Sequence, residues 1–91
     1  MVISLNIVPK KLGKFVGKNK KTGEILLKNA NGIIISITTP VYYIWKLVNG
    51  RKSIGQIIEE FMEFYGIYAE NPEELILEIL EELKKASLVS F

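Results

Sequence analysis

The sequence predicts an α+β fold of the winged-helix type, in which a three-stranded antiparallel sheet is followed by three helices. An isoleucine-rich run follows the turn signal Asn31-Gly32, and β-branched residues in such a run favour an extended strand. At Thr39-Pro40 the spacing of apolar residues changes from that of a strand to that of a helix. Asn49-Gly50 then closes this helix, and Ser53 with Gln56 forms a capping box that starts the next one.

The sheet is expected to begin near Phe15-Val16, inside a lysine-rich segment. Thr22-Gly23 ends a turn, and a second strand follows over residues 24–28. A hairpin loop over residues 29–32 returns the chain antiparallel along residues 33–37. Within that third strand one face carries Ile33, Ile35 and Ile37, which we expect in the core, and the other face carries Ile34 and Ser36.

The segment ahead of the sheet has its own pattern. Ile3, Leu5 and Ile7 alternate with polar residues, which predicts a short edge strand or an arm that Pro9 ends. With 91 residues and 48% hydrophobic content the chain is large enough for one core. We therefore expect a single domain over residues 1–91, in which residues 1–11 form the extra strand or arm.

Two helices are predicted over residues 40–48 and 54–65. The first has a broad apolar face, with Tyr42, Tyr43 and Lys46 pointing away from it. The second places its glutamates outside and has Gly66 as its stop. The residues expected to be buried are Val41, Ile44, Trp45, Leu47 and Val48 in the first helix, and Ile54, Ile57, Ile58, Phe61 and Tyr65 in the second.

The third helix carries every start signal. Asn71 is a good cap, Pro72 suits the first helical position, and acids follow at the positive end of the helix dipole. Leu77 falls on a flank of this helix, roughly 130° from the centre of the apolar stripe, and shares that flank with Glu73, Leu80 and Lys84. The stripe itself comprises Leu75, Ile76, Ile79, Leu80, Leu83 and Ala86.

Composition excludes several classes of function. The chain contains no Cys, no His and no Asp, so all ten of its acids are Glu. A thiolate nucleophile, a Ser-His-Asp triad and a zinc site of ordinary ligands are therefore excluded, and we expect no metal and no cofactor. Abundant Lys and Glu without Cys favour a thermophilic source. The absence of a basic stretch ahead of an apolar one, and of an uncharged run long enough to span a bilayer, predicts a cytoplasmic protein without a membrane partner.

Charge is divided unequally along the chain. Residues 1–52 hold ten Lys and Arg against Glu24, a net charge of +9, whereas residues 53–91 hold two Lys against nine Glu, a net charge of −7. Two interpretations remain open: the halves are solvated faces that attract each other weakly within the fold, or a basic edge attracts an acidic partner.

The order of these signals resembles the PqqD-like family, named for coenzyme PQQ synthesis protein D. The resemblance covers about residues 12–90. Thr38 and residues 29–31 depart from the family's usual residues, and Asn49 matches by position but replaces the usual Asp. The residues that carry it are Leu26, Leu27, Gly32, Ile37, Ile44, Trp45, Asn49, Gly50, Ser53, Ile54, Ile57, Leu88 and Val89.

The resemblance implies a peptide-recognition module, in which the leader of a ribosomally made precursor peptide adds as a strand beside the third strand and over the third helix. Strand addition needs an exposed edge and nearby pockets for alternate side chains. The module would present its peptide to a separate modifying enzyme, such as a radical SAM maturase. The residues expected to contact the peptide are Ile33, Ile34, Ile35, Ser36 and Ile37 on the strand, and Glu73, Ile76, Leu77, Leu80 and Lys84 on the helix.

Two other functions remain open. A winged-helix nucleic-acid binder would share the helix-turn-helix packing and could use the basic half of the chain. A scaffold or homodimerisation domain could use the N-terminal arm and an exposed Tyr42-Tyr43 pair. An enzyme is the class least supported, because no nucleophile stands beside an activating base.

The acidic third helix generates a prediction about nucleic acids. Five glutamates on the helix expected to enter a DNA groove repel phosphates. We expect no sequence-specific duplex binding at about 150 mM salt, and only weak, steeply salt-dependent affinity from the lysine-rich arm. A gel-shift titration that finds nanomolar affinity for a defined duplex, as specific sites have, would contradict the peptide-binding interpretation.

Overall fold

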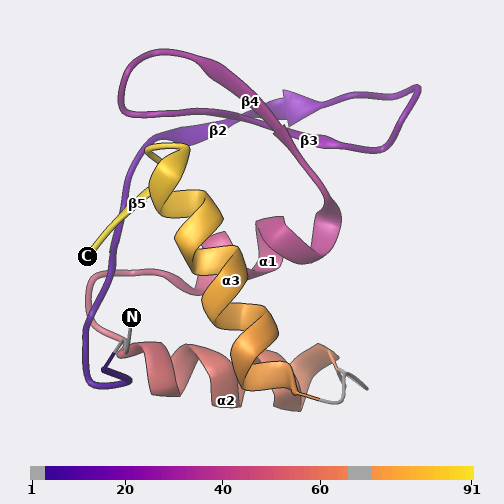
Figure 1. Ribbon diagram of the computed structural model, residues 1–91. Coiled ribbons are helices and arrows are strands. Elements are labelled where there is room, and N and C mark those ends of the chain that lie inside the picture. The colour runs from indigo at the N-terminus through magenta and orange to yellow at the C-terminus, as the bar shows by residue number, and fades with distance from the viewer. Residues whose placement is uncertain (1–3, 66–70) are drawn as a thin grey trace.

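The structure, a computed structural model, describes residues 4–65 and 71–91 (Figure 1). Ile3 of the predicted arm, the side chain of Tyr65 and the predicted stop at Gly66 lie outside the described residues. The elements in chain order are β1 (Lys10–Lys11), β2 (Lys14–Lys18), β3 (Ile25–Lys28), β4 (Ile34–Ile37), α1 (Thr39–Leu47), α2 (Ile54–Tyr65), α3 (Pro72–Lys85) and β5 (Val89–Ser90).

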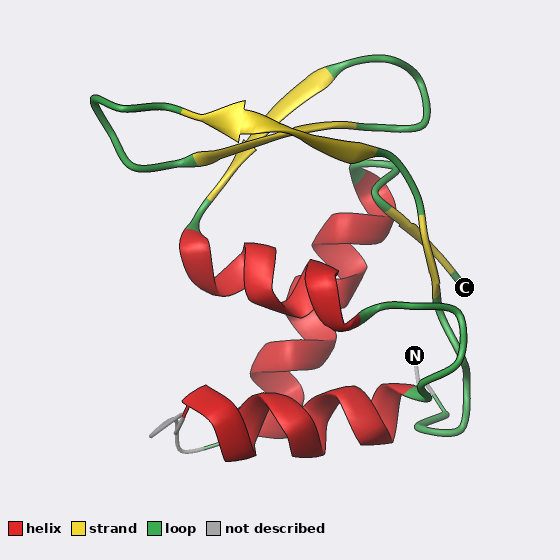
Figure 2. Ribbon diagram, turned by 180° about the vertical axis from the view of Figure 1, so that it is seen from behind, coloured by secondary structure: helices red, strands yellow, loops and turns green. Residues whose placement is uncertain are grey.

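The predicted α+β fold is confirmed: the antiparallel sheet β2-β3-β4 is followed by three helices. β3 pairs with β4 so that Ile25 faces Ile37 and Leu27 faces Ile35. A β-bulge interrupts the pairing of β2 with β3 between Phe15 and Gly17. A second, two-stranded ladder joins β1 to β5. The three helices lie together on one side of the sheet, and α1 follows directly from β4 (Figure 2).

The predicted helix starts correspond to observed caps. In the capping box, the Gln56 amide donates to Ser53 Oγ (3.2 Å) and the Ser53 amide donates to Gln56 Oε1 (2.9 Å). At the start of α3, the Glu74 amide donates to the side-chain oxygen of Asn71 (3.3 Å). The first helix begins one residue earlier than expected, with Thr38 as its N-cap and Pro40 in its first turn. The sequence signals thus place all three helices to within a residue or so.

The N-terminal segment is an arm, and no strand occurs within residues 4–9. Its carbonyls cap α2: the Ile54 amide donates to Ile7 O (2.8 Å) and the Gly55 amide donates to Leu5 O (2.9 Å). The first amides of a helix have no partner within the helix, so the arm satisfies two donors that water would otherwise bind. The buried Pro9 then leads the chain into β1.

The core lies between the inner face of the sheet and the helices. Within the described residues, no helix is both long and apolar enough to cross a bilayer. Two residues expected in the core are exposed: Ile33 is 55% exposed, because it precedes β4 at the hairpin end of the strand, and Leu75 in the first turn of α3 is 39% exposed. The buried apolar residues are Ile25, Leu27, Ile37, Ile44, Trp45, Val48, Ile54, Ile57, Ile58, Phe61, Ile76, Leu80, Leu83, Leu88 and Val89.

Trp45 connects α1 to two segments far apart in sequence, one at Leu12 and one at Leu88. Its side chain is 4% exposed, and its indole N–H donates to Leu12 O (3.2 Å) and Leu88 O (3.0 Å). The ring of Tyr42 stacks on it at 6.0 Å between centroids, and the ring of Phe15 lies 5.8 Å from that of Tyr42. Tyr42 and Tyr43 are therefore half-buried against the core rather than pointing away from it, which corrects the sequence expectation.

We expect Trp45→Ala to lower the free energy of unfolding by about 3–5 kcal/mol, because it removes a large buried ring and leaves a cavity. Trp45→Phe keeps most of the ring but removes the indole donor, and should cost about 1–3 kcal/mol. Urea denaturation followed by circular dichroism measures both values. A Trp45→Ala variant as stable as the parent would contradict the central position of this ring.

Candidate functional site

β4 forms one edge of the sheet, and its hydrogen-bonding register shows which of its groups are free. The Asn29 amide donates to Ile33 O (2.8 Å), so these two residues form a hydrogen-bonded pair. Such pairs alternate with non-hydrogen-bonded pairs along an antiparallel ladder. Ile35 and Ile37 therefore direct their N–H and C=O groups toward β3. The N–H and C=O groups of Ile34 and Ser36 point away from the sheet, available to another strand.

The two edges of this sheet differ. The β2 edge carries the bulge at Phe15/Gly17 together with Lys14 and Lys18. Bulges and edge lysines are devices by which proteins prevent unwanted strand pairing. β4 has neither: its four residues are uncharged, and its register with β3 is regular. Of the two edges of this sheet, the β4 edge is therefore the one without a feature that opposes pairing with a further strand.

Asn29 holds the β3–β4 hairpin against the end of α3. Its side chain is buried, and its Oδ1 accepts from the amides of Asn31 and Ile33, both at 2.9 Å. Its Nδ2 donates to Ala86 O (2.8 Å), just beyond α3, and the Ala30 amide donates to Ser87 O (3.1 Å). Buried polar groups of this kind are costly unless paired. The position of β4 relative to α3 is thus set by specific hydrogen bonds.

A cleft of about 310 Å³ lies between β4 and α3. We name it the β4–α3 cleft. Apolar side chains dominate its lining, and Glu82 contributes a carboxylate. Its lining residues are Ile35, Ser36, Ile37, Thr38, Val41, Glu82, Leu83, Ala86 and Leu88.

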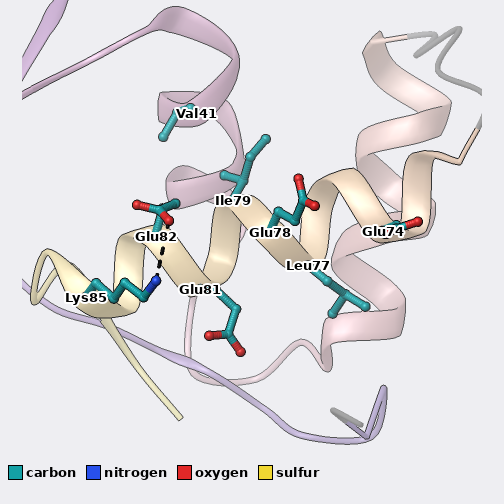
Figure 3. A pocket seen from close by; sticks show the side chains of 8 residues that line it. All are labelled: Val41, Glu74, Leu77, Glu78, Ile79, Glu81, Glu82 and Lys85. Carbon is teal, nitrogen blue, oxygen red and sulfur yellow. Dashed lines mark ion pairs between the residues drawn. The ribbon is translucent and has the colours of Figure 1, made fainter. Parts of the chain in front are cut away.

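A larger hollow of about 750 Å³ lies along the exposed side of α3; we name it the α3 hollow. It shares Val41 and Glu82 with the β4–α3 cleft, so the two are neighbours. Figure 3 shows Ile79 and Glu82 on the side of α3 that faces Val41, and Leu77 on the opposite side. Its lining residues are Val41, Glu74, Leu77, Glu78, Ile79, Glu81, Glu82 and Lys85.

The strand residues predicted to bind the peptide lie at the β4–α3 cleft or beside it. The predicted helix residues do not lie together: some are in the core and others are at the surface. Ile35, Ser36 and Ile37 line the β4–α3 cleft, while Ile33 and Ile34 are exposed beside it. On α3, Ile76 and Leu80 are both 0% exposed, so their side chains belong to the core, and neither lines the β4–α3 cleft or the α3 hollow. Leu77 lines the α3 hollow on the flank opposite Val41.

The remaining two helix residues, Glu73 and Lys84, are exposed. Lys84 places its ammonium 4.7 Å from the centroid of the Phe91 ring, beside the C-terminal strand. Neither residue lines the β4–α3 cleft or the α3 hollow.

Sequence reasoning missed the helix residues that do face β4. Ala86 was assigned to the core stripe but is half-buried at the cleft, and Glu82 was not singled out; Ile79, also assigned to the stripe, is half-buried and lines the α3 hollow with Val41. An amphipathic helix has two flanks beside its buried stripe, and the sequence contains no signal that tells which flank faces the sheet. Asn29 was likewise missed, because its residue type fits an ordinary turn as well as a buried tether.

Several basic residues of the N-terminal half lie on the strands β1, β2 and β3, whereas α3 carries Lys84 and Lys85 in its last turn. Lys11 in β1 places its ammonium 4.5 Å from the centroid of the Trp45 ring and donates to Lys46 O (3.4 Å). Burial lowers the pKa of Lys11 below its usual value, and the positive charge of Lys46 lowers this pKa further. Lys14, Lys18 and Lys28 project from the sheet. No ion pair joins these lysines to a carboxylate of α3 in the described residues, whereas Lys52 pairs with Glu60 across the two halves of the chain.

Comparison with protein families matches residues 24–89 to Coenzyme PQQ synthesis protein D (PqqD). No curated protein and no solved structure matches the chain. The matched span runs from just before β3 into β5, so it contains both walls of the β4–α3 cleft and all three helices. Because this span covers well over half of the chain, the protein belongs to the PqqD family.

Proposed function

We propose that this protein is a non-catalytic peptide-binding module. It binds the leader of a ribosomally made precursor peptide as an additional strand beside β4 and presents the peptide to a separate modifying enzyme. The enzyme class that fits the family is a radical SAM maturase, which would carry out the chemistry with its own cofactor. The proposal assigns no catalytic step to this chain, in keeping with a sequence that lacks Cys, His and Asp.

One observation carries the proposal: the unprotected β4 edge opens onto an apolar cleft. Recognition by strand addition takes its affinity from main-chain hydrogen bonds and its selectivity from pockets for alternate side chains. The free N–H and C=O groups of Ile34 and Ser36 meet the first requirement. The β4–α3 cleft, which Ile35 and Ile37 line, meets the second.

The site also suits a reversible partner. Exposed apolar residues beside it, Ile33 at 55% and Ile34 at 50%, remain in water until a partner covers them. A peptide strand would bury part of this exposed apolar area. The core would not need to repack, because the buried residues of α3 and of the sheet already form one cluster. Binding of this kind adds a strand to a finished fold, so it does not require the module to unfold.

Amide exchange tests the strand addition directly. We expect the leader of a short peptide encoded next to this protein's gene to slow hydrogen exchange at the Ile34 and Ser36 amides. The Ile35 and Ile37 amides already donate within the sheet and should change little. The measurement is amide exchange by NMR, with and without the leader. Protection at Ile35 and Ile37 alone, or at no residue of β4, would place the peptide elsewhere.

A pair of proline variants tests the same register. Proline lacks the N–H donor, and an edge position whose N–H faces away from the sheet tolerates it. Ile34→Pro should fold and melt near the parent, yet bind the leader at least tenfold more weakly, about 1.4 kcal/mol. Ile35→Pro should lower the free energy of unfolding by about 1–3 kcal/mol, because it removes a hydrogen bond to β3. Equal destabilisation by the two variants would refute the assigned register.

A second pair decides which flank of α3 faces the peptide. Ile79 and Leu77 are both half-buried apolar residues, and glutamine is a good helix former without charge. Ile79→Gln should weaken leader binding roughly fivefold, about 1 kcal/mol, by removing apolar contact on the flank of α3 that faces Val41. Leu77→Gln should bind as the parent does. Calorimetric titration compares them, and the reverse ranking would move the peptide to the flank of Leu77.

A further inference from the structure

Carboxylates border the site on the helix side. Glu74, Glu78 and Glu82 follow one another at intervals of four residues on α3, so they form a row along one side of the helix. All three line the α3 hollow, and Glu82 also lines the β4–α3 cleft. Figure 3 shows Glu78 and Glu82 on the side of α3 that faces Val41. The acidic row therefore begins at the cleft beside β4, with Glu82, and continues away from it along the α3 hollow, with Glu78 and Glu74.

Little within the described residues neutralises this row. Lys85 is the cation that lines the α3 hollow, and its contact with Glu82 is long, at 3.7 Å, with both side chains about three-quarters exposed (73% and 74%). Such an exposed pair contributes almost nothing. Glu74 Oε2 accepts from Asn71 Nδ2 (3.0 Å), which leaves its charge in place. No ion pair involves Glu78 or Glu81 in the described part of the chain.

The apolar lining beside the row limits which partner fits. Val41 and Ile79 lie next to Glu78 and Glu82 in the α3 hollow. An apolar strip with carboxylates at its border suits a lysine or arginine side chain, whose methylene stem covers apolar surface while its charged end reaches a carboxylate. A glutamate or aspartate at the same place would bring like charges together and gain no hydrogen bond.

We infer that the peptide bound beside β4 is cationic on the side that faces α3. Its lysine or arginine side chains cross Val41 and Ile79 and pair with Glu78 and Glu82, while its main chain bonds to Ile34 and Ser36. This inference rests on the proposed strand addition and adds its selectivity. The acidic row excludes acidic segments from the groove and draws basic segments toward it, an effect that salt weakens.

Synthetic peptides of one length test the selectivity. In each peptide valine alternates with a second residue, which is lysine, glutamate or serine. The valines favour an extended strand in all three peptides, and the lysine and glutamate peptides carry opposite charges. Fluorescence anisotropy gives their dissociation constants with the full chain at low and at high salt. We expect the lysine peptide to bind at least tenfold more tightly than the glutamate peptide, with the serine peptide between them. This difference should shrink at high salt.

Two double variants separate the acidic row from the general charge of the protein. Glu78→Gln with Glu82→Gln removes two charges from the groove, and Glu59→Gln with Glu63→Gln removes two from the exposed face of α2. Both keep helix-forming residues. The groove variant should reduce the preference for lysine over glutamate to less than threefold, whereas the α2 variant should keep it. Equal losses in the two variants would show that net charge, and not the groove, selects the peptide.

Amide exchange at Ile34 and Ser36 tests strand addition separately from the selectivity for a cationic peptide. Protection of these amides by all three peptides, with similar affinities, would overturn the charge selectivity and leave strand addition standing. Binding of the lysine peptide without protection of these amides would overturn both, because the peptide would then lie on the acidic surface alone. The expected result is protection by the lysine peptide in the parent and in the α2 variant.

Discussion

The geometry of the candidate site depends on one buried asparagine. The Asn29 side chain accepts from two amides at the start of β4 and donates to the carbonyl of Ala86 at the end of α3. A single side chain thus holds both walls of the β4–α3 cleft. Hydrogen bonds of this kind add little net stability, but leaving their groups buried and unpaired costs about 1–3 kcal/mol for each. The cleft therefore has one well-defined width rather than a range of widths.

The rest of the fold leaves that site free by placing its stabilising contacts elsewhere. Trp45 ties α1 to the segments around Leu12 and Leu88, and the N-terminal arm caps α2. These contacts join residues far apart in sequence, and none of them uses the outward-facing N–H and C=O groups of Ile34 and Ser36. The edge strand itself supplies only Ile35 and Ile37 to the core side. The atoms of β4 that stabilise the fold are consequently different from the atoms that we propose bind a peptide.

Much of the fold could be predicted because its signals are local. The capping box at Ser53, the cap at Asn71 and the turn before β4 each act within a few residues of sequence. The errors concern contacts between distant elements. The sequence predicted that Tyr42 points outward, but the ring of Phe15 from β2 packs against it. The sequence also predicted that Ile33 is in the core, but Ile33 precedes β4 and is exposed.

The candidate site shows the same division between local and long-range information. The strand half, Ile35 to Ile37, followed from β propensity and hairpin order and lies at the cleft. The helix half was placed on the flank of Leu77, because only the sheet's position shows that Glu82 and Ala86 face β4. Asn29 needs α3 for its partner, so its role is invisible in the turn that contains it.

The difference between the two sheet edges also governs how this protein can associate with itself. A head-to-tail contact, β4 of one copy on β2 of the next, would build a fibre unless its rotation closed a ring. The bulge and lysines of β2 oppose that contact. The pairing that remains joins β4 to β4 about a twofold axis, and it uses up both free edges at once. Association through this edge closes at two copies, and any peptide strand on β4 displaces it.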